Sequence, residues 1–247
     1  MNQPDVPRST DAGIDAAAAI RHVAQGDPTD RPTAIRQRRS SPVYDHLLWR
    51  LQSVLGDDAG TAYALGLVGC EAKTGVTTIA ANLALRAAEQ NWGSVLLVET
   101  DWYAPRLANL WHVPGQPGAA QLFAGAAPLV ECVQPGPVAG LHVVPAGIVS
   151  HREQPLVDSN AVREFMAEAR VDYRLIIVDL PCPDRLRQEL ILARLLDQAL
   201  LVVRAETTRQ GEAKRAVRQL QQDGVPLAGA ILNRQRSYLP AWLRRRM

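Results

Sequence analysis

The sequence predicts a doubly wound α/β domain built on a mostly parallel sheet. Two observations lead to this prediction: short, continuously apolar segments recur along the chain, and amphipathic helical patterns alternate with them. Strands that are apolar throughout are typical of a sheet covered by helices on both faces. Ligands bind such sheets at the carboxyl ends of the strands, so the residues after each strand are the first candidates for chemistry.

The elements are expected in a regular order, beginning with a helix in which Tyr44, Leu47, Leu48 and Leu51 recur at helical spacing. The strands, identified as aliphatic runs, are expected over residues 63–68, 94–98, 141–144, 175–178, 198–203 and 228–232. The remaining helices, identified by their apolar periodicity, are expected over residues 77–90, 162–169, 187–195 and 212–223. A region rich in Gly and Pro, with helices and turns, precedes the third strand.

The chain is expected to divide into three regions. Residues 1–40 are rich in Pro, Asp, Arg and Ala and predict a flexible leader, interrupted at most by a short helix over residues 14–24. The domain itself spans residues 41–235. Residues 236–247 form a basic tail. The positive charge is concentrated towards this end: residues 204–247 contain ten Lys and Arg and three Asp and Glu, a net charge of +7, whereas the rest of the chain carries about −5.

The composition favours a cytoplasmic protein. Apolar residues make up 47% of the 247 residues, which is enough for a substantial core. Three widely spaced cysteines show neither a metal pattern nor a disulfide framework, as expected in a reducing compartment. The N-terminus lacks the apolar core of a signal peptide, and the chain lacks the roughly 18 consecutive apolar residues of a membrane span.

A candidate phosphate loop joins the first strand to the following helix. Its nucleotide-binding candidates are Gly69, Lys73, Thr74, Gly75, Val76, Thr77 and Thr78. Backbone N–H groups at a helix N-terminus bind phosphate, and a threonine hydroxyl at the start of the helix holds Mg²⁺. The arrangement of strand, loop and helix therefore indicates a sheet of the P-loop NTPase type.

Val76 stands where a working phosphate loop carries a lysine. The full signature ends in Gly-Lys-Ser/Thr, and here Gly75 and Thr77 flank a valine. The lysine supplies the charge that holds the β- and γ-phosphates and offsets charge developing during transfer. Without it, backbone amides and Mg²⁺ would bind nucleotide weakly. Lys73 is either a substitute for the missing charge or a solvated loop lysine.

Acidic residues follow two of the later strands. Glu99 and Asp101 end the second strand, and Asp179 follows the strand over residues 175–178. Acids at strand ends beside a phosphate loop suit coordination of a metal-bound water and activation of an attacking oxygen. Thr77, Asp101 and Asp179 are therefore the candidate metal residues, and the two aspartates are also the catalytic candidates. The alternative interpretation of a single Asp ending a strand is a turn former.

Two more candidates for nucleotide binding follow the last strand. The carboxamide of Asn233 suits the edge of a nucleobase, and Arg234 comes next in the chain. Other classes of site find no support, because the histidines show no ligand spacing and no Ser/His/Asp arrangement with a nucleophile elbow is visible.

A set of sequence elements extends from about residue 41 to residue 234. They are Gly75-x-Thr77-Thr78-x-x-Ala81-Asn82-Leu83-Ala84, Val95-Leu96-Leu97-Val98-x-x-Asp101-x-x-x-Pro105-x-Leu107, Gly140-Leu141-x-Val143-x-Pro145-Ala146-Gly147, Asp172-Tyr173-x-x-Ile176-Ile177-x-Asp179-x-Pro181 and Leu232-Asn233. In these elements the chain resembles the bacterial tyrosine kinases of capsule and exopolysaccharide systems (BY-kinases), within the wider Min/Par deviant-Walker ATPases. The Pro-Ala-Gly element favours the polysaccharide branch.

The resemblance implies ATP with Mg²⁺, autophosphorylation in a tyrosine-rich tail and assembly into homo-oligomeric rings. It also implies a membrane-bound partner, a polysaccharide co-polymerase or chain-length regulator. By position, Thr77 would hold the metal, Asp101 and Asp179 would organise metal and water, and Asn233 would lie near the adenine.

The chain departs from the family pattern at the positions that carry chemistry. Val76 replaces the loop lysine, and Glu99 replaces the first Asp of the second Walker element. Tyr103 stands where an Arg is usual, and Glu71 stands where Min/Par proteins have a second lysine. The tail offers only Tyr238 as a phosphorylation site.

Three functions therefore remain open. The first is a weak or non-catalytic nucleotide-binding regulator of polysaccharide biosynthesis or export. The second is an active autokinase or ATPase that uses Lys73 or a partner's basic residue. The third is a Par/Min-like positioning ATPase. Trp242 beside the arginines at 244–246 suggests contact with the inner face of the plasma membrane, and no nucleic-acid partner is expected.

Overall fold

The structure, a computed structural model, describes residues 42–55, 61–147 and 156–234. Their elements in chain order are α1 (Pro42–Leu55), β1 (Tyr63–Gly69), α2 (Val76–Glu89), β2 (Val95–Glu99), α3 (Leu107–Trp111), α4 (Ala119–Phe123), α5 (Leu129–Cys132), β3 (Gln134–Pro135), β4 (Leu141–Val144), α6 (Ser159–Asp172), β5 (Leu175–Leu180), α7 (Leu190–Ala193), β6 (Gln198–Arg204), α8 (Gln210–Gln222) and β7 (Leu227–Asn233). The expected leader helix over 14–24, Tyr238 and the basic tail lie outside the described residues.

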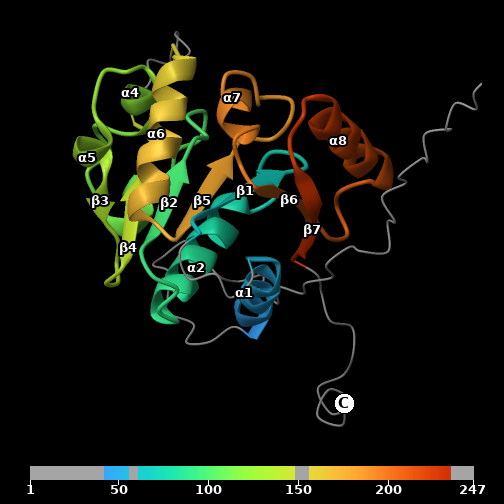
Figure 1. The fold of residues 1–247 in the computed structure, drawn as a ribbon. Helices are drawn as coiled ribbons and strands as arrows, with labels where there is room; N and C mark the ends of the chain where they lie inside the picture. The colour runs from blue at the N-terminus through green and yellow to red at the C-terminus, as the bar shows by residue number, and fades with distance from the viewer. Residues whose placement is uncertain (1–41, 56–60, 148–155, 235–247) are drawn as a thin grey trace, which may run out of the picture.

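The strands of the described residues form a seven-stranded sheet in the order β3-β4-β2-β5-β1-β6-β7 (Figure 1). All neighbours are parallel except the short pair β3 and β4. The predicted fold class, a doubly wound and mostly parallel α/β sheet, is confirmed. Because β1 lies between β5 and β6, the loop that follows β1 sits over the middle of the sheet.

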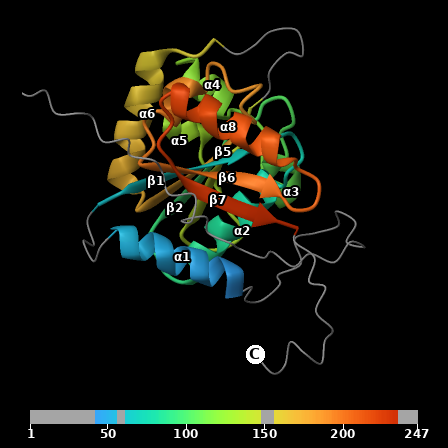
Figure 2. The same ribbon diagram turned by 90° about the vertical axis from the view of Figure 1, so that its right-hand side faces the viewer.

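Helices cover both faces of the sheet, as the continuously apolar strands predicted (Figure 2). One core holds α1 and α2, and the other holds α4 to α8. Alternate residues of β1 reach the two cores: Leu65 and Leu67 pack with α1 and α2, whereas Ala64 and Val68 pack on the opposite face. A strand buried on both sides explains why its sequence shows no polar alternation.

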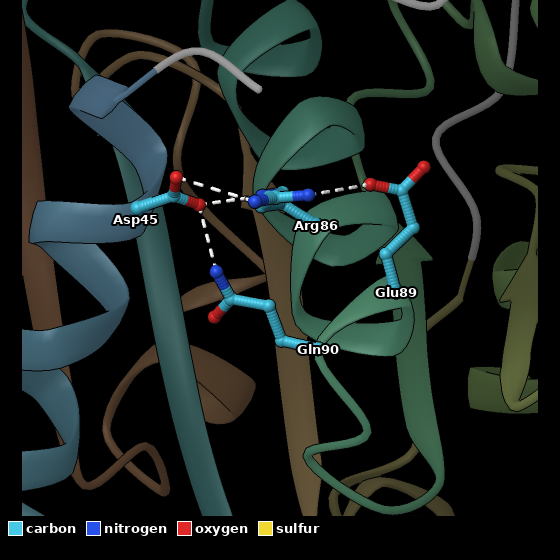
Figure 3. A network of polar contacts seen from close by, with 4 residues as sticks. All are labelled: Asp45, Arg86, Glu89 and Gln90. Atoms are coloured by element: carbon cyan, nitrogen blue, oxygen red, sulfur yellow. Dashed lines mark hydrogen bonds and ion pairs between the residues drawn. The ribbon is translucent and has the colours of Figure 1, made fainter. Parts of the chain in front are cut away.

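The first helix is attached to α2 through apolar and polar contacts. Leu47, Leu48 and Leu51 of α1 are buried in the core that α2 also lines. On the adjoining surface the carboxylate of Asp45 accepts hydrogen bonds from Arg86, and Arg86 also reaches Glu89 on its own helix (Figure 3). The apolar residues whose spacing predicted this helix, Leu47, Leu48 and Leu51, are thus the ones on its buried face.

The structure moves several expected boundaries. β5 continues to Leu180 and β2 to Glu99, so Asp179 and Glu99 lie inside strands instead of after them. The helix expected over 187–195 is reduced to the four residues of α7, because turns at both ends interrupt it. Within the described residues, no helix combines the length and apolarity needed to cross a membrane.

Candidate functional site

The phosphate-loop candidate is a tight turn between β1 and α2. Gly75 precedes α2 with a left-handed φ of 94°, which glycine adopts without strain. A Cβ on Gly69 would lie 2.4 Å from the Thr74 hydroxyl oxygen and 3.0 Å from a methyl of Val76, so the loop folds closely over the end of β1. The first N–H groups of α2 have no partner within the helix and face the space where an anion would bind.

The structure places Val76 and Lys73 differently. Val76 is the first residue of α2, and its half-buried side chain packs against the core of α1 and α2. Lys73 is exposed at the turn of the loop, with a left-handed φ of 64°. The side chain at position 76, where the resemblance implies a lysine, therefore packs inward, whereas Lys73 is exposed. Thr78 is exposed on the first turn of α2.

The outer side of the loop is tied to the segment before α8. The Thr208 hydroxyl donates to a carboxylate oxygen of Glu71 at 2.7 Å and accepts the N–H of Arg204 at 3.2 Å. Inside the loop, the Thr74 hydroxyl donates to the carbonyl of Glu71 at 3.2 Å. Glu71, which stands where Min/Par proteins have a lysine, thus anchors the loop to its neighbour.

Asp179 lies beneath the start of α2. Its side chain is 1% exposed, and burial raises the pKa of its carboxyl well above the ordinary value, while a hydrogen bond from the Thr77 hydroxyl acts in the opposite direction. One carboxylate oxygen, Oδ2, has no hydrogen-bond partner. The structure therefore brings together Thr77 and Asp179, two of the three metal candidates.

Glu99 is the register partner of Asp179 on the neighbouring strand β2. It is fully buried and accepts three backbone N–H groups: Arg106 at 2.6 Å, Leu107 at 3.1 Å and Ala146 at 3.2 Å. Burial raises the pKa of Glu99 to about 7, against the effect of these three donors. This carboxylate joins β2 to the start of α3 and to the segment after β4.

Asp101 follows β2 at the same edge of the sheet. Burial raises the pKa of its carboxyl, the Arg185 guanidinium lowers it, and the Oδ1 atom has no hydrogen-bond partner. The Cζ atom of Arg185 lies 5.4 Å from the ring centroid of Tyr103, a cation–π arrangement. Sequence reasoning missed Arg185, which supplies positive charge near the position where the family has an Arg and this chain has Tyr103.

Sequence reasoning also missed a fourth acidic group, Glu189. It is 3% exposed, and its Oε2 atom accepts the N–H of Arg187 at 3.0 Å, while Oε1 has no partner. Burial raises the pKa of Glu189, and the Asp101 carboxylate raises it further. Because Glu189 sits in an apolar periodic segment, the sequence offered no signal apart from a charge on the buried side.

Asn233 ends β7 beside the phosphate loop and is 7% exposed. Its amide nitrogen donates to the carbonyl of Thr74 at 2.7 Å, and its amide oxygen accepts the N–H of Arg234 at 2.8 Å. Both ends of the carboxamide are therefore used within the protein, and contact with an adenine stays a prediction. Arg234 itself is exposed and has a left-handed φ of 56°.

The arrangement fits part of a magnesium–nucleotide site. No group of three His, Cys, Asp or Glu side chains able to hold a metal occurs among the described residues. The unpartnered oxygens of Asp101 and Asp179, with the Thr77 hydroxyl, suit a Mg²⁺ that keeps several waters and shares its coordination with phosphates. The start of α2 suits the phosphates, but position 76 contributes no charge.

Comparison with known proteins identifies relatives of the chain. No protein-family model matches it. The tyrosine-protein kinase Wzc of Salmonella typhi is 26% identical over 222 residues, which cover 90% of this chain and 29% of Wzc. EpsB of Ralstonia solanacearum is 30% identical over 176 residues, covering 71% of this chain and 23% of EpsB. The chain thus spans less than a third of the length of these relatives.

Solved structures share its fold. The kinase domain of Escherichia coli ETK has a TM-score of 0.69 at 23% identity, covering 81% of this chain and 78% of that one. The VpsO kinase domain has a TM-score of 0.62 at 27% identity, with coverage of 78% and 99%. The septum site-determining protein MinD of Pyrococcus horikoshii, solved with Mg-ADP, has a TM-score of 0.59 at 24% identity, with coverage of 75% and 76%. Homologues of this chain are thus bacterial tyrosine kinases (BY-kinases), and its structural neighbours include BY-kinase domains and a Min-type P-loop ATPase.

Proposed function

We propose that this chain is a BY-kinase-like P-loop protein of capsule or exopolysaccharide biosynthesis or export that binds nucleotide weakly and regulates instead of catalysing. The observation that carries the proposal is Val76, the half-buried first residue of α2, at the position of the family's phosphate-binding lysine. A valine there offers neither charge nor hydrogen-bond donor to the phosphates.

The rest of the site supports binding better than it supports transfer. The N-terminus of α2 would face the phosphates, Thr77 would hold Mg²⁺, and Asp101 and Asp179 would hold its waters. Mg²⁺–ATP, when bound, supplies a transferable phosphoryl group and neutralises part of its charge. The missing lysine weakens the stabilisation of charge that develops during transfer, so turnover should suffer more than binding.

The proposed partner is a membrane-bound polysaccharide co-polymerase or chain-length regulator, at the inner face of the plasma membrane, with the chain assembled as a homo-oligomer. The relationship to Wzc supports this placement, because the resemblance to the capsule and exopolysaccharide kinases implies such a partner. A protein that binds nucleotide without transferring phosphate would control the partner through its own bound or free state.

Four proteins test the proposal: the native chain, Val76→Lys, Val76→Met and Lys73→Ala. Titration calorimetry with Mg²⁺–ATP measures binding, and labelled ATP with mass spectrometry measures phosphotransfer. We expect weak binding and no turnover for the native chain, and about tenfold tighter binding for Val76→Lys, which corresponds to about 1.4 kcal/mol. Val76→Met adds length without charge and should behave like the native chain, as should Lys73→Ala.

The contrary outcomes are distinct. Robust phosphotransfer by the native chain overturns the proposal. If that activity disappears in Lys73→Ala and phosphate is found on Tyr238, the chain is an autokinase that uses the loop lysine. If ATP is hydrolysed without tyrosine phosphorylation, and flotation with anionic liposomes depends on nucleotide, the chain is a positioning ATPase of the Par/Min kind.

A further inference from the structure

Two cysteines lie at matching positions beyond neighbouring strands. β1 and β5 are parallel and paired in register, from Tyr63 opposite Leu175 to Val68 opposite Leu180. β1 ends at Gly69 and β5 at Leu180, and the same register carried two residues past the last pair would place Cys70 opposite Cys182. Neighbouring strands are about 4.8 Å apart, and a disulfide needs Cα atoms about 4.4–6.8 Å apart. A register continued in this way would set the two backbones at a separation that a disulfide can bridge.

The alternation of side chains along the two strands points to the same side of the sheet for both thiols. Val68 of β1 and Cys70, the first residue after that strand, line the core beneath α4 to α8, and so do Val178 and Leu180 of β5. Carried one step past the end of β5, the same alternation would turn Cys182 to this side. Burial raises the pKa of Cys70 to about 11. Cys182 is among the neighbouring groups that raise this pKa further, which is consistent with two thiols that lie near each other.

Their accessibility differs in a way that suits stepwise oxidation. All three cysteines are free thiols, with Cys70 and Cys132 buried and Cys182 half-buried. The half-buried thiol is the one that an external oxidant reaches. Cys132 lies on α5 and belongs to neither strand of the pair.

We propose that Cys70 and Cys182 form a reversible disulfide that links the start of the phosphate loop to the segment after β5. The bond would join the loop directly to Cys182, three residues after Asp179. Neither the nucleotide site nor the proposed regulatory role is needed for this inference, which rests on the register of two strands and the side on which two thiols lie.

The reaction balances with an oxidised low-molecular-weight disulfide such as oxidised glutathione. The Cys182 thiolate attacks the glutathione S–S bond, which breaks, and one glutathione thiolate leaves as a mixed disulfide forms. The Cys70 thiolate then attacks the Cys182 sulfur and displaces the second glutathione. Two protein thiols are oxidised, one glutathione disulfide is reduced to two thiols, and the two protons pass to the departing thiolates.

The rate should depend strongly on pH. Burial raises the pKa of Cys182, and the nearby Arg185 guanidinium acts in the opposite direction, while the Asp184 and Asp101 carboxylates add to the rise. For Cys70, burial is joined by the carboxylates of Glu71, Glu212 and Asp184. Both thiols are therefore mostly protonated at neutral pH, and exchange should speed up under mildly alkaline conditions.

The sequence makes the product easy to identify. Trypsin places the three cysteines in separate peptides, residues 51–73 for Cys70, residues 107–152 for Cys132 and residues 175–185 for Cys182. The full chain is incubated with oxidised glutathione at mildly alkaline pH, free thiols are blocked, and the digest is analysed by mass spectrometry. We expect the cross-linked pair 51–73 with 175–185, lighter by two hydrogens than the two free peptides, and its loss after dithiothreitol.

Variants and a denatured sample decide the outcome. Cys132→Ser should form the cross-link at the native rate, whereas Cys70→Ser and Cys182→Ser should stop at the mixed glutathione disulfide. The oxidised native chain should melt a few degrees higher, reversed by dithiothreitol. The inference is overturned if the folded chain yields only mixed disulfides, if Cys132 enters the cross-link, or if the 70–182 bond forms equally well in urea.

Discussion

The side-chain amide of Asn233 donates a hydrogen bond of 2.7 Å to the backbone carbonyl of Thr74, 159 residues earlier in the chain. The contact is made where the last strand passes the phosphate loop. The neighbouring residue, Gly75, permits it because a Cβ there would lie 2.5 Å from the Asn233 amide nitrogen. The end of β7 therefore fixes the conformation of the loop just before α2 begins.

Replacing Asn233 by Ala should destabilise the protein and loosen the loop. The buried carbonyl of Thr74 loses its donor, which costs about 1–2 kcal/mol in free energy of unfolding, measured by urea denaturation. Hydrogen exchange should accelerate at the amides of residues 75–77. Asn109→Ala, at an exposed asparagine of α3, is the matched control and should leave both quantities near their native values. Equal effects of the two substitutions would show that the hydrogen bond from Asn233 to Thr74 does not hold the loop.

Gly75→Ala and Gly211→Ala should change stability in opposite directions. Gly211 lies in α8 with nothing within 4 Å of an added Cβ, so alanine there should stabilise the protein by about 0.5–1 kcal/mol through helix propensity. At Gly75 the left-handed φ of 94° strains any L side chain, and the new Cβ meets Asn233, so alanine should cost about 1–2 kcal/mol or more.

A double variant separates the two causes at Gly75. In the background of Asn233→Ala the steric contact is gone, while the backbone strain persists. Gly75→Ala should therefore cost less in that background than in the native chain, as measured by thermal unfolding. If the cost is the same in both backgrounds, the contact with Asn233 contributes nothing and the glycine is required by its φ alone.

The fold could be predicted because its central strands, β1, β2 and β5, are buried at every residue. In Val95–Glu99, for example, every residue before the final glutamate is apolar. The helices lie between such apolar runs. The phosphate loop followed from local spacing, since Gly75, Thr77 and the start of α2 are neighbours in sequence. Such features depend on short stretches of chain, and short stretches are what sequence patterns describe.

The contacts that complete the site depend on distant segments, and no local pattern shows them. Glu99 takes its three donors from positions 7, 8 and 47 residues later in the chain. Asn233 was expected near an adenine, because its position at a strand end says nothing of what its amide already binds. Glu189 escaped notice because it is a charged residue in a segment predicted from its apolar periodicity, and only the fold shows that it is buried.

The burial of Glu99 should make stability depend on pH. Its pKa is about 7 in the folded protein against 4.5 ordinarily, so between these values the folded state holds a proton that the unfolded state releases. The stabilisation that the folded state gains from this bound proton is fully present below pH 4.5 and is lost as pH rises towards 7. The melting temperature of the native chain, measured relative to that of Glu99→Gln, should fall across this window and level off above it.

A second substitution shows whether that profile belongs to Glu99. Asp179, whose pKa is raised by burial and further by the Glu99 carboxylate, titrates in both proteins, and the loss of the Glu99 charge should lower its pKa in Glu99→Gln. Glu164→Gln removes an exposed carboxylate from α6 and should leave the native profile unchanged. Parallel melting profiles of the native chain and Glu99→Gln across the window would show that the buried carboxyl keeps its ordinary pKa.

The pairing of Asp45 with Arg86 should contribute measurably to the docking of α1 on α2. The two side chains are 34% and 25% exposed, and Asp45 also accepts a hydrogen bond from Gln90 at 2.7 Å (Figure 3). A double-mutant cycle with Asp45→Ala and Arg86→Ala should give a coupling energy of about 0.5–1 kcal/mol, reduced at high salt.

A second ion pair in the same chain provides the comparison. Arg215 and Asp184 approach to 3.8 Å with both side chains 76% exposed, so solvent screens their interaction and ordering them costs side-chain entropy. The same cycle on this pair should give a coupling close to zero. If both cycles give equal couplings, partial burial and the additional hydrogen bond do not strengthen the Asp45–Arg86 pair.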